Sequence, residues 1–94
     1  MNFALLGDDP AVVPLVAAIA AHPGHQLTRA SLVGATTLSK LLQIAPGLSI
    51  DDGWEGWVSN PTVDTVIVVG DDDAVLDAAR KLAAAGRSLM ILPI

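Results

Sequence analysis

Two short acidic stretches offer the clearest chemistry in this sequence. Asp8 and Asp9 follow one apolar run, and Asp71, Asp72 and Asp73 follow another. Clustered carboxylates are the ligands that hard cations such as Mg²⁺ take. The same residue type also caps helices, and negative charge is favourable at a helix N-terminus. These stretches therefore have three possible interpretations: a cation site, helix capping, or a site for some other ligand or partner.

The other residues that could do chemistry are isolated. His22 and His25 flank a Pro-Gly turn, where a metal would need a third ligand and a solvated turn is the alternative. The chain has no cysteine, which removes disulfides, thiolate metal sites and cysteine nucleophiles. Trp54 and Trp57 could anchor a partner or pack a short helix, capped at residues 51–52, onto the sheet edge. The sequence supports no catalytic and no metal-binding residue.

The second acidic stretch lies inside a strand–helix–strand unit. Val66 to Val69 form an unbroken β-branched run, which is typical of a strand covered on both faces. Gly70 ends this run, and residues 71–73 offer N-caps for the helix that follows. The apolar face of that helix is predicted to carry Val75, Leu76, Ala79, Leu82 and Ala83. Gly86 stops the helix before the apolar run Leu89 to Leu92, so the two strands must be parallel.

The first third of the chain has the same alternation. Phe3 to Leu6 form a buried strand that ends at Gly7. A helix follows, with Val12, Leu15, Val16, Ile19 and Ala20 on its apolar face. Proline suits the first position of a helix, so we expect this helix to begin at Pro14.

The middle of the chain adds two more strands and a helix. Residues 26–33 are predicted to form a less buried second strand, and residues 48–50 a brief third strand. Between them Thr36 or Thr37 is expected to cap a short helix. The apolar residues of that helix are Leu38, Leu41, Leu42 and Ile44.

This alternation predicts a three-layer α/β fold, a Rossmann-like domain with a parallel sheet of about five strands. Right-handed crossovers give the strand order 3-2-1-4-5, with strands 1 and 4 adjacent at the centre. The turns at residues 8–9 and 71–73 then meet at the carboxyl ends of these strands. Folds of this type bind ligands at that topological switch point.

Composition narrows the function classes. The 94 residues suit a single domain, and a 52% hydrophobic content excludes disorder. The net charge of −5 argues against binding nucleic acid or an anionic membrane. The N-terminus has no basic region, and no apolar run approaches the roughly 18 residues of a membrane span. We expect a cytoplasmic protein.

At this point a family resemblance emerges. Residues 60–86 (NPTVDTVIVVGDDDAVLDAARKLAAAG) resemble the later part of the dinucleotide-binding domain of the glucose–fructose oxidoreductase / inositol dehydrogenase / MocA (Gfo/Idh/MocA) family. That family shows a P-x-V-D-x-V-I-V-A-T-P strand and a helix ending A-L-x-A-G. Ala20–Leu27 (AAHPGHQL) resembles its turn between first helix and second strand. The resemblance implies a fold that binds NAD or NADP, and it ends where the family's substrate domain begins, so that domain is expected to be absent.

The family's phosphate-loop glycines do not carry over well. They fall on Gly7, Asp9 and Val12, so only the first is kept. The second glycine lets the backbone approach the diphosphate, and the third lets helix and strand pack closely. The family's ribose-binding acid falls near Leu32 or Val33, and neither can accept a hydrogen bond from a hydroxyl.

The later motifs of the family also change. Its Thr-Pro after strand 4 becomes Gly70-Asp71, and its helix histidine becomes Val75. The segment from Gly86 onward is one residue short, and Leu92 or its neighbour replaces the catalytic lysine. This segment alone is therefore not expected to transfer hydride.

Two function classes remain after this comparison. The chain is either the nucleotide-binding half of an NAD(P)-dependent oxidoreductase with weakened or lost cofactor binding, or a non-enzymatic structural or interaction module. The candidate cofactor-binding positions are Gly7, Asp8, Asp9, Gly70 and Asp71. We also expect self-association through strand 5 or the faces beside it, because an apolar edge strand invites pairing.

Overall fold

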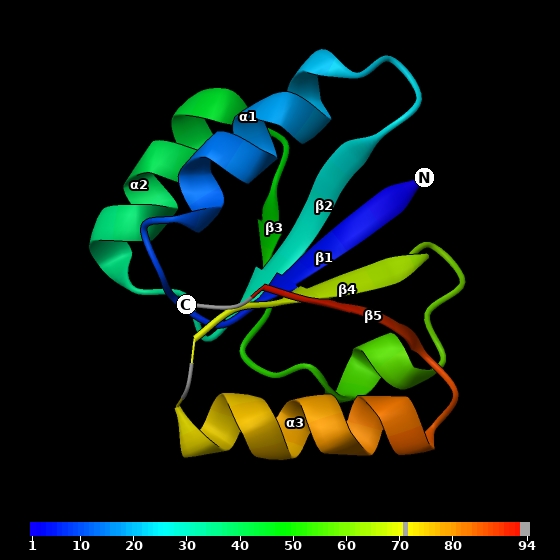
Figure 1. Cartoon of the computed structure of the whole chain (residues 1–94). Coiled ribbons are helices and arrows are strands. Elements are labelled where there is room, and N and C mark those ends of the chain that lie inside the picture. The colour runs from blue at the N-terminus through cyan, green and yellow to red at the C-terminus, as the bar shows by residue number, and fades with distance from the viewer. Residues whose placement is uncertain (71, 93–94) are drawn as a thin grey trace.

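The computed structural model describes residues 1–70 and 72–92. Strands alternate with helices along the chain (Figure 1). The strands are β1 (Asn2–Leu6), β2 (Gln26–Ser31), β3 (Ser49–Ile50), β4 (Thr65–Val68) and β5 (Ser88–Ile91). The helices are α1 (Val12–Ala21), α2 (Ala35–Ile44), α3 (Asp73–Ala84) and a short 3₁₀ helix, η1 (Glu55–Val58).

The strands form one parallel sheet in the order β3-β2-β1-β4-β5, which confirms the predicted topology. β1 lies at the centre, where Leu5 is paired with Ala30 of β2 and with Ile67 of β4. The runs 3–6 and 66–69 are buried throughout. Helices cover both faces of the central strands in a parallel sheet, which is why these runs contain no polar residue.

Helices cover both faces of the sheet. α1 and α2 lie on one face, and α3 and η1 lie on the other (Figure 1). Alternate side chains of β1 enter two separate hydrophobic clusters. Leu5 packs in the cluster that contains Val16 of α1, whereas Leu6 packs with Trp57 of η1 and Leu82 of α3. The alternation follows from the two-residue period of a strand.

The start of α1 differs from the prediction. The helix begins at Val12, so Pro14 is its third residue rather than its first. A proline is tolerated there because the first N–H groups of a helix have no partner within the helix. The apolar face is otherwise as expected at Val12, Val16 and Ile19, while Ala20 is exposed.

The start of α2 also differs. The N-cap is Gly34, and neither threonine caps the helix by a side-chain hydrogen bond. Thr37 lies inside the helix and is buried, and Leu42, expected on the apolar face, is exposed. Capping by Thr36 or Thr37 was therefore a wrong prediction, because the backbone turns into the helix earlier, at Gly34.

The ends of α3 follow the sequence closely. The Asp72 side chain caps the helix by accepting a hydrogen bond from the N–H of Ala74 at 2.8 Å. At the other end Gly86 has φ +85°, its N–H reaches the carbonyl of Ala83, and the Arg87 N–H reaches that of Leu82. This pair of bonds is a Schellman motif, which needs the positive φ that glycine adopts without strain.

The buried face of α3 was only partly predicted. Val75, Ala79 and Leu82 are buried as expected, but Leu76 and Ala83 are exposed and Ala78 takes their place. The helix is rotated so that Ala78, rather than Leu76, lies against the sheet.

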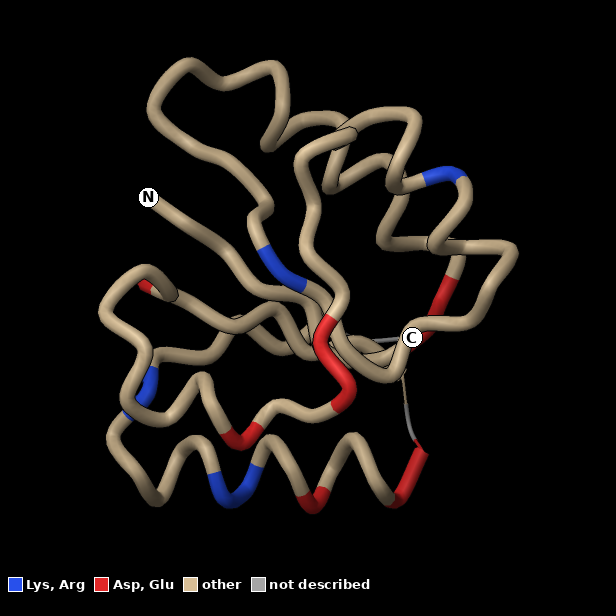
Figure 2. The backbone as a smooth tube through the Cα atoms, turned by 180° about the vertical axis from the view of Figure 1, so that it is seen from behind, with Lys and Arg blue, Asp and Glu red and all other residues tan. Residues whose placement is uncertain are grey.

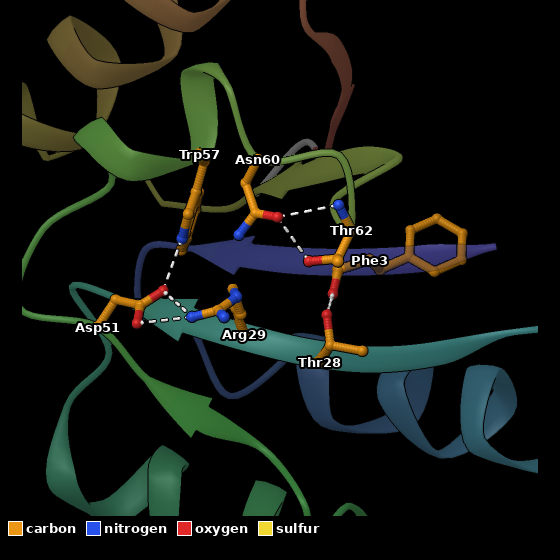
Figure 3. Close-up of polar contacts among 7 residues, drawn as sticks. All are labelled: Phe3, Thr28, Arg29, Asp51, Trp57, Asn60 and Thr62. Atoms are coloured by element: carbon orange, nitrogen blue, oxygen red, sulfur yellow. Dashed lines mark hydrogen bonds and ion pairs between the residues drawn. The ribbon is translucent and has the colours of Figure 1, made fainter.

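Asp51 connects β2 to the segment after β3, which crosses from one face of the sheet to the other (Figure 3). Its carboxylate accepts from Arg29 Nη1 at 3.0 and 3.2 Å and from Trp57 Nε1 at 2.7 Å. Neither Asp51 nor Asp52 caps η1, whose N-cap is Trp54, so that prediction was wrong. Trp57 is buried in the cluster over β1 and β4, which places it on the central sheet rather than on the predicted edge.

Candidate functional site

A cavity of about 570 Å³ lies at the carboxyl ends of β1 and β4. Three chain segments form its wall: the loop after β1, the residues after β2 and the residues after β4. Asp8, Asp9, Gly70 and Asp72 all line it. The strand order therefore brings the two acidic turns together, at the place where such folds bind ligands. Asp71, also a candidate position, lies outside the described residues.

Gly7 is a packing position rather than part of the open cavity. It is buried, its φ is +108°, and its N–H donates to the carbonyl of Ser31 at 3.1 Å. A Cβ at this position would lie 1.8 Å from the carbonyl oxygen of Val69. Glycine is thus required for β1 to pass close to the end of β4, and its N–H is not free for a ligand.

Three backbone donors at the start of α1, those of Ala11, Val12 and Val13, have partners within the preceding loop. Asp9 Oδ1 accepts from the N–H of Ala11 at 2.8 Å. The N–H of Val12 donates to the Asp9 carbonyl, and that of Val13 donates to the Pro10 carbonyl. Pro14 follows and has no N–H. Phosphate sites at helix N-termini depend on free N–H groups that point at the anion, and here those groups have partners within the loop.

Each carboxylate of the cavity lies at the start of a different helix. Asp9 precedes α1, and Asp72 caps α3. Asp8 lies beside the start of α2, since a Cβ on the N-cap Gly34 would come within 2.4 Å of Asp8 Oδ2. Negative charge at a helix N-terminus is favourable. The capping interpretation is therefore confirmed by hydrogen bonds for Asp72, and Asp9 plays a similar part in the turn before α1.

The charge of this cavity is of one sign. Among the residues that the structure describes, its lining contains three aspartates and no lysine, arginine or histidine. In Figure 2 acidic positions mark the loop after β1 and the start of α3, and others lie after β3, in η1, before β4 and within α3, whereas the basic positions lie on α2, α3, β2 and just before β5. A diphosphate entering this cavity would meet carboxylates rather than counter-charges.

The tip of β2 contributes an unusual backbone. Leu32 has φ +59°, is 43% exposed, and lines the cavity together with Val33. Positive φ is uncommon for a branched apolar residue and costs about 1–3 kcal/mol. This conformation could not be predicted from the sequence, because leucine does not mark it. The two residues place apolar groups in the wall of this cavity.

The histidine turn is less solvated than expected. His22 is exposed, but His25 is only half-exposed and its ring packs edge-on against Phe3 with ring centroids 5.6 Å apart. Within residues 1–70 and 72–92, no three His, Asp or Glu side chains are grouped closely enough to hold a metal ion. Every helix in the same residues is too short or too polar to cross a bilayer.

Comparison with known proteins shows the fold alone. No protein-family model matches the sequence, and no curated protein is detectably similar to it. Among solved structures, the chain is similar to KijD10, a 3-ketoreductase from Actinomadura kijaniata in complex with TDP-benzene and NADP. The TM-score is 0.68 at 15% identity, and the match covers 97% of this chain and 29% of that one. The chain thus has a Rossmann-like fold and spans less than a third of the protein it resembles.

Proposed function

We propose that this chain is a Rossmann-like domain of the nucleotide-binding type, derived from the dinucleotide-binding half of a Gfo/Idh/MocA oxidoreductase, in which NAD(P) binding is weakened or lost. The strand order and the cavity at the switch point support the nucleotide-binding origin. The similarity to a reductase solved with NADP supports it as well.

The closed loop before α1 carries the proposal of weakened binding. The N–H groups of Ala11, Val12 and Val13 have partners within the loop, and Asp9 adds a negative charge where the diphosphate would lie. Hydrogen bonds and charge at a helix N-terminus are what normally hold a dinucleotide diphosphate, so both contributions are missing.

Hydride transfer by this segment alone is not part of the proposal. The described part of the cavity wall consists of carboxylates, glycines and apolar side chains and contains no lysine. The resemblance places the family's catalytic lysine at Leu92 or its neighbour. Leu92 packs against the hydrophobic cluster beneath α1 and α2, and its hydrocarbon side chain has no proton to give.

The second candidate is a non-enzymatic structural or interaction module. The observation that favours it is the exposed outer strand, where Met90 is 39% and Ile91 is 67% exposed. An unpaired strand edge with apolar side chains is suited to strand addition by another chain.

Calorimetric titration with NADH and NADPH tests the first proposal. We expect no binding in the micromolar range or tighter for the native chain, and no recovery in Asp9→Gly, because Val12 and the missing ribose acid remain. Asp52→Gly, an exposed aspartate away from the cavity, is the matched control. Micromolar or tighter binding of either dinucleotide by the native chain would show that the loop opens, and would overturn the proposal.

A further inference from the structure

β5 is an outer strand that lacks the residues which usually prevent edge strands from pairing. In the part of the chain that the structure describes, it has a neighbouring strand on one side only, which is β4. Its sequence, Ser88–Ile91, contains no charged residue and no proline. Charged side chains and prolines are what commonly protect the edge of a sheet. The outer backbone groups of β5 are therefore open to a strand of another chain.

α3 lies beside this edge, over both β4 and β5 (Figure 1). Leu82 of α3 belongs to one hydrophobic cluster with Val66 of β4, and Leu89 of β5 packs against that cluster. Neighbouring strands are about 4.8 Å apart, so a helix centred over β4 and β5 lies about that far from a two-fold axis at the outer edge of β5. The α3 helices of two copies joined there would lie about 10 Å apart, close to the spacing of packed helices, about 8–10 Å.

One flank of α3 is apolar, exposed and directed toward the same edge. Leu76 is 42% exposed, and Ala83, two turns further along the helix, is also exposed. Ala78 lies about 160° around the helix from Leu76 and is buried in the cluster that contains Trp57 of η1. η1 therefore covers the opposite flank, and Leu76 faces the side of β5. On that side Ile91, the next residue of β5 on this face after Leu89, is 67% exposed.

The charges of α3 are separated along its exposed side. Asp73 and Asp77 lie in the first half of the helix, and Arg80 and Lys81 lie in the second half (Figure 2). Lys81 pairs with Asp77 at 2.9 Å, whereas Arg80 is exposed and forms no ion pair with any described residue. A second α3 that runs antiparallel would bring its acidic half against Arg80, and a parallel one would bring like charges together. The helix is thus complementary to an antiparallel copy of itself.

We propose that this chain forms a two-fold dimer in which two β5 strands pair antiparallel and two α3 helices pack side by side. The inference rests on the second candidate function, the interaction module, and names its partner as a second copy of the chain. Leu76 and Ile91 form the apolar part of the interface, and Arg80 of each copy lies against Asp73 and Asp77 of the other copy. The two sheets become one, whose outer strands are the two-residue β3.

Charge exchange on α3 tests this arrangement. Arg80→Glu makes the second half of the helix less basic, and Asp73→Lys with Asp77→Lys makes the first half basic. We expect the dissociation constant of the dimer, measured by sedimentation velocity, to rise at least about tenfold in each variant alone, because like charges then meet twice across the axis. An equimolar mixture of the two variants is expected to restore association. The helix dipole favours the same order of charges within one chain but predicts no such rescue.

Lys40→Glu is the matched control for Arg80→Glu. It makes the same change of charge at an exposed position of α2, on the other face of the sheet, and should leave the dissociation constant within about twofold. Circular dichroism checks that every variant is folded. If Arg80→Glu and Lys40→Glu associated equally while Ile91→Lys became monomeric, strands would pair without α3, which would overturn this inference and leave the interaction module standing. A native chain that stayed monomeric at the highest concentration would overturn both.

Discussion

At the residue scale, Asp51 joins three parts of the fold. Its carboxylate binds Arg29 of β2 and the indole of Trp57, and its N–H donates to the Ala30 carbonyl. Trp57 is 1% exposed, so its Nε1 has no access to water. The indole can pack into the core only because this acceptor reaches it.

We therefore expect Asp51→Ala to destabilise the fold by about 1–3 kcal/mol, the cost of leaving a buried donor without a partner. Urea denaturation followed by tryptophan fluorescence measures the change. Asp52→Ala removes an exposed neighbour with the same charge and should stay within about 0.5 kcal/mol. Equal effects in the two variants would mean that Asp51 acts through charge alone.

A glycine pair gives a second prediction at this scale. Gly7→Ala would place a methyl group against the Val69 carbonyl at a positive φ, and we expect a loss of about 2–4 kcal/mol in the free energy of unfolding. Gly47 has open space around its Cβ position, so Gly47→Ala should change it by about 0.5 kcal/mol or less. Thermal and urea unfolding of both variants provide the comparison, and a stable Gly7→Ala would contradict the close contact.

At the scale of elements, the protonation of His25, in the turn between α1 and β2, is coupled to folding. The folded pKa of His25 lies below its usual value of 6.5, because burial, His22 and the N-terminal ammonium disfavour the charged ring. The unfolded chain therefore binds more protons at acid pH, and stability falls as pH drops below the unfolded pKa.

This predicts that the native chain loses more stability than His25→Phe between about pH 7.5 and about pH 5.5. Urea midpoints at each pH measure it, and the difference between the two proteins removes the contribution of the carboxylates. His22→Phe removes one neighbouring charge and should lessen the loss. If the stability of the native chain and of His25→Phe changed with pH in the same way, His25 protonation would not be coupled to folding.

The same elements show what the sequence could and could not predict. Strand positions and order followed from apolar runs such as Val66 to Val69 and from the short connections, because burial on both faces leaves a clear pattern. The start of α1 at Val12 and the N-cap of α2 at Gly34 were not predicted. The path of the backbone determines where each helix begins, and several neighbouring residues were suitable as the cap or first residue. No local pattern marks the positive φ of Leu32, and the packing of His25 depends on Phe3, which lies far from it in the sequence.

At the scale of the whole molecule, the two sheet edges differ. β3 has only two residues, whereas β5 has four and exposes Met90 and Ile91. A longer apolar edge offers more unpaired backbone groups for pairing with a second copy. We expect the chain to self-associate through β5 or the faces beside it.

Sedimentation velocity at rising concentration tests this expectation. Ile91→Lys should shift the chain toward monomer, because a charge on an edge strand opposes pairing. Ile50→Lys places the same change on the opposite edge at a similarly exposed isoleucine and should leave the association unchanged. A native chain that stays monomeric at the highest concentration would refute self-association.

The three aspartates of the crevice have an evolutionary consequence. Asp72 caps α3, Asp9 accepts a hydrogen bond in the turn before α1, and Asp8 lies beside the start of α2, so all three carboxylates lie near helix N-termini. Under the proposed loss of NAD(P) binding, a lineage that regained a diphosphate ligand would have to replace these side chains, and replacing the cap Asp72 would weaken the start of α3 by about 1 kcal/mol. Return to dinucleotide binding therefore runs through less stable intermediates. Selection for stability alone therefore tends to preserve these three aspartates.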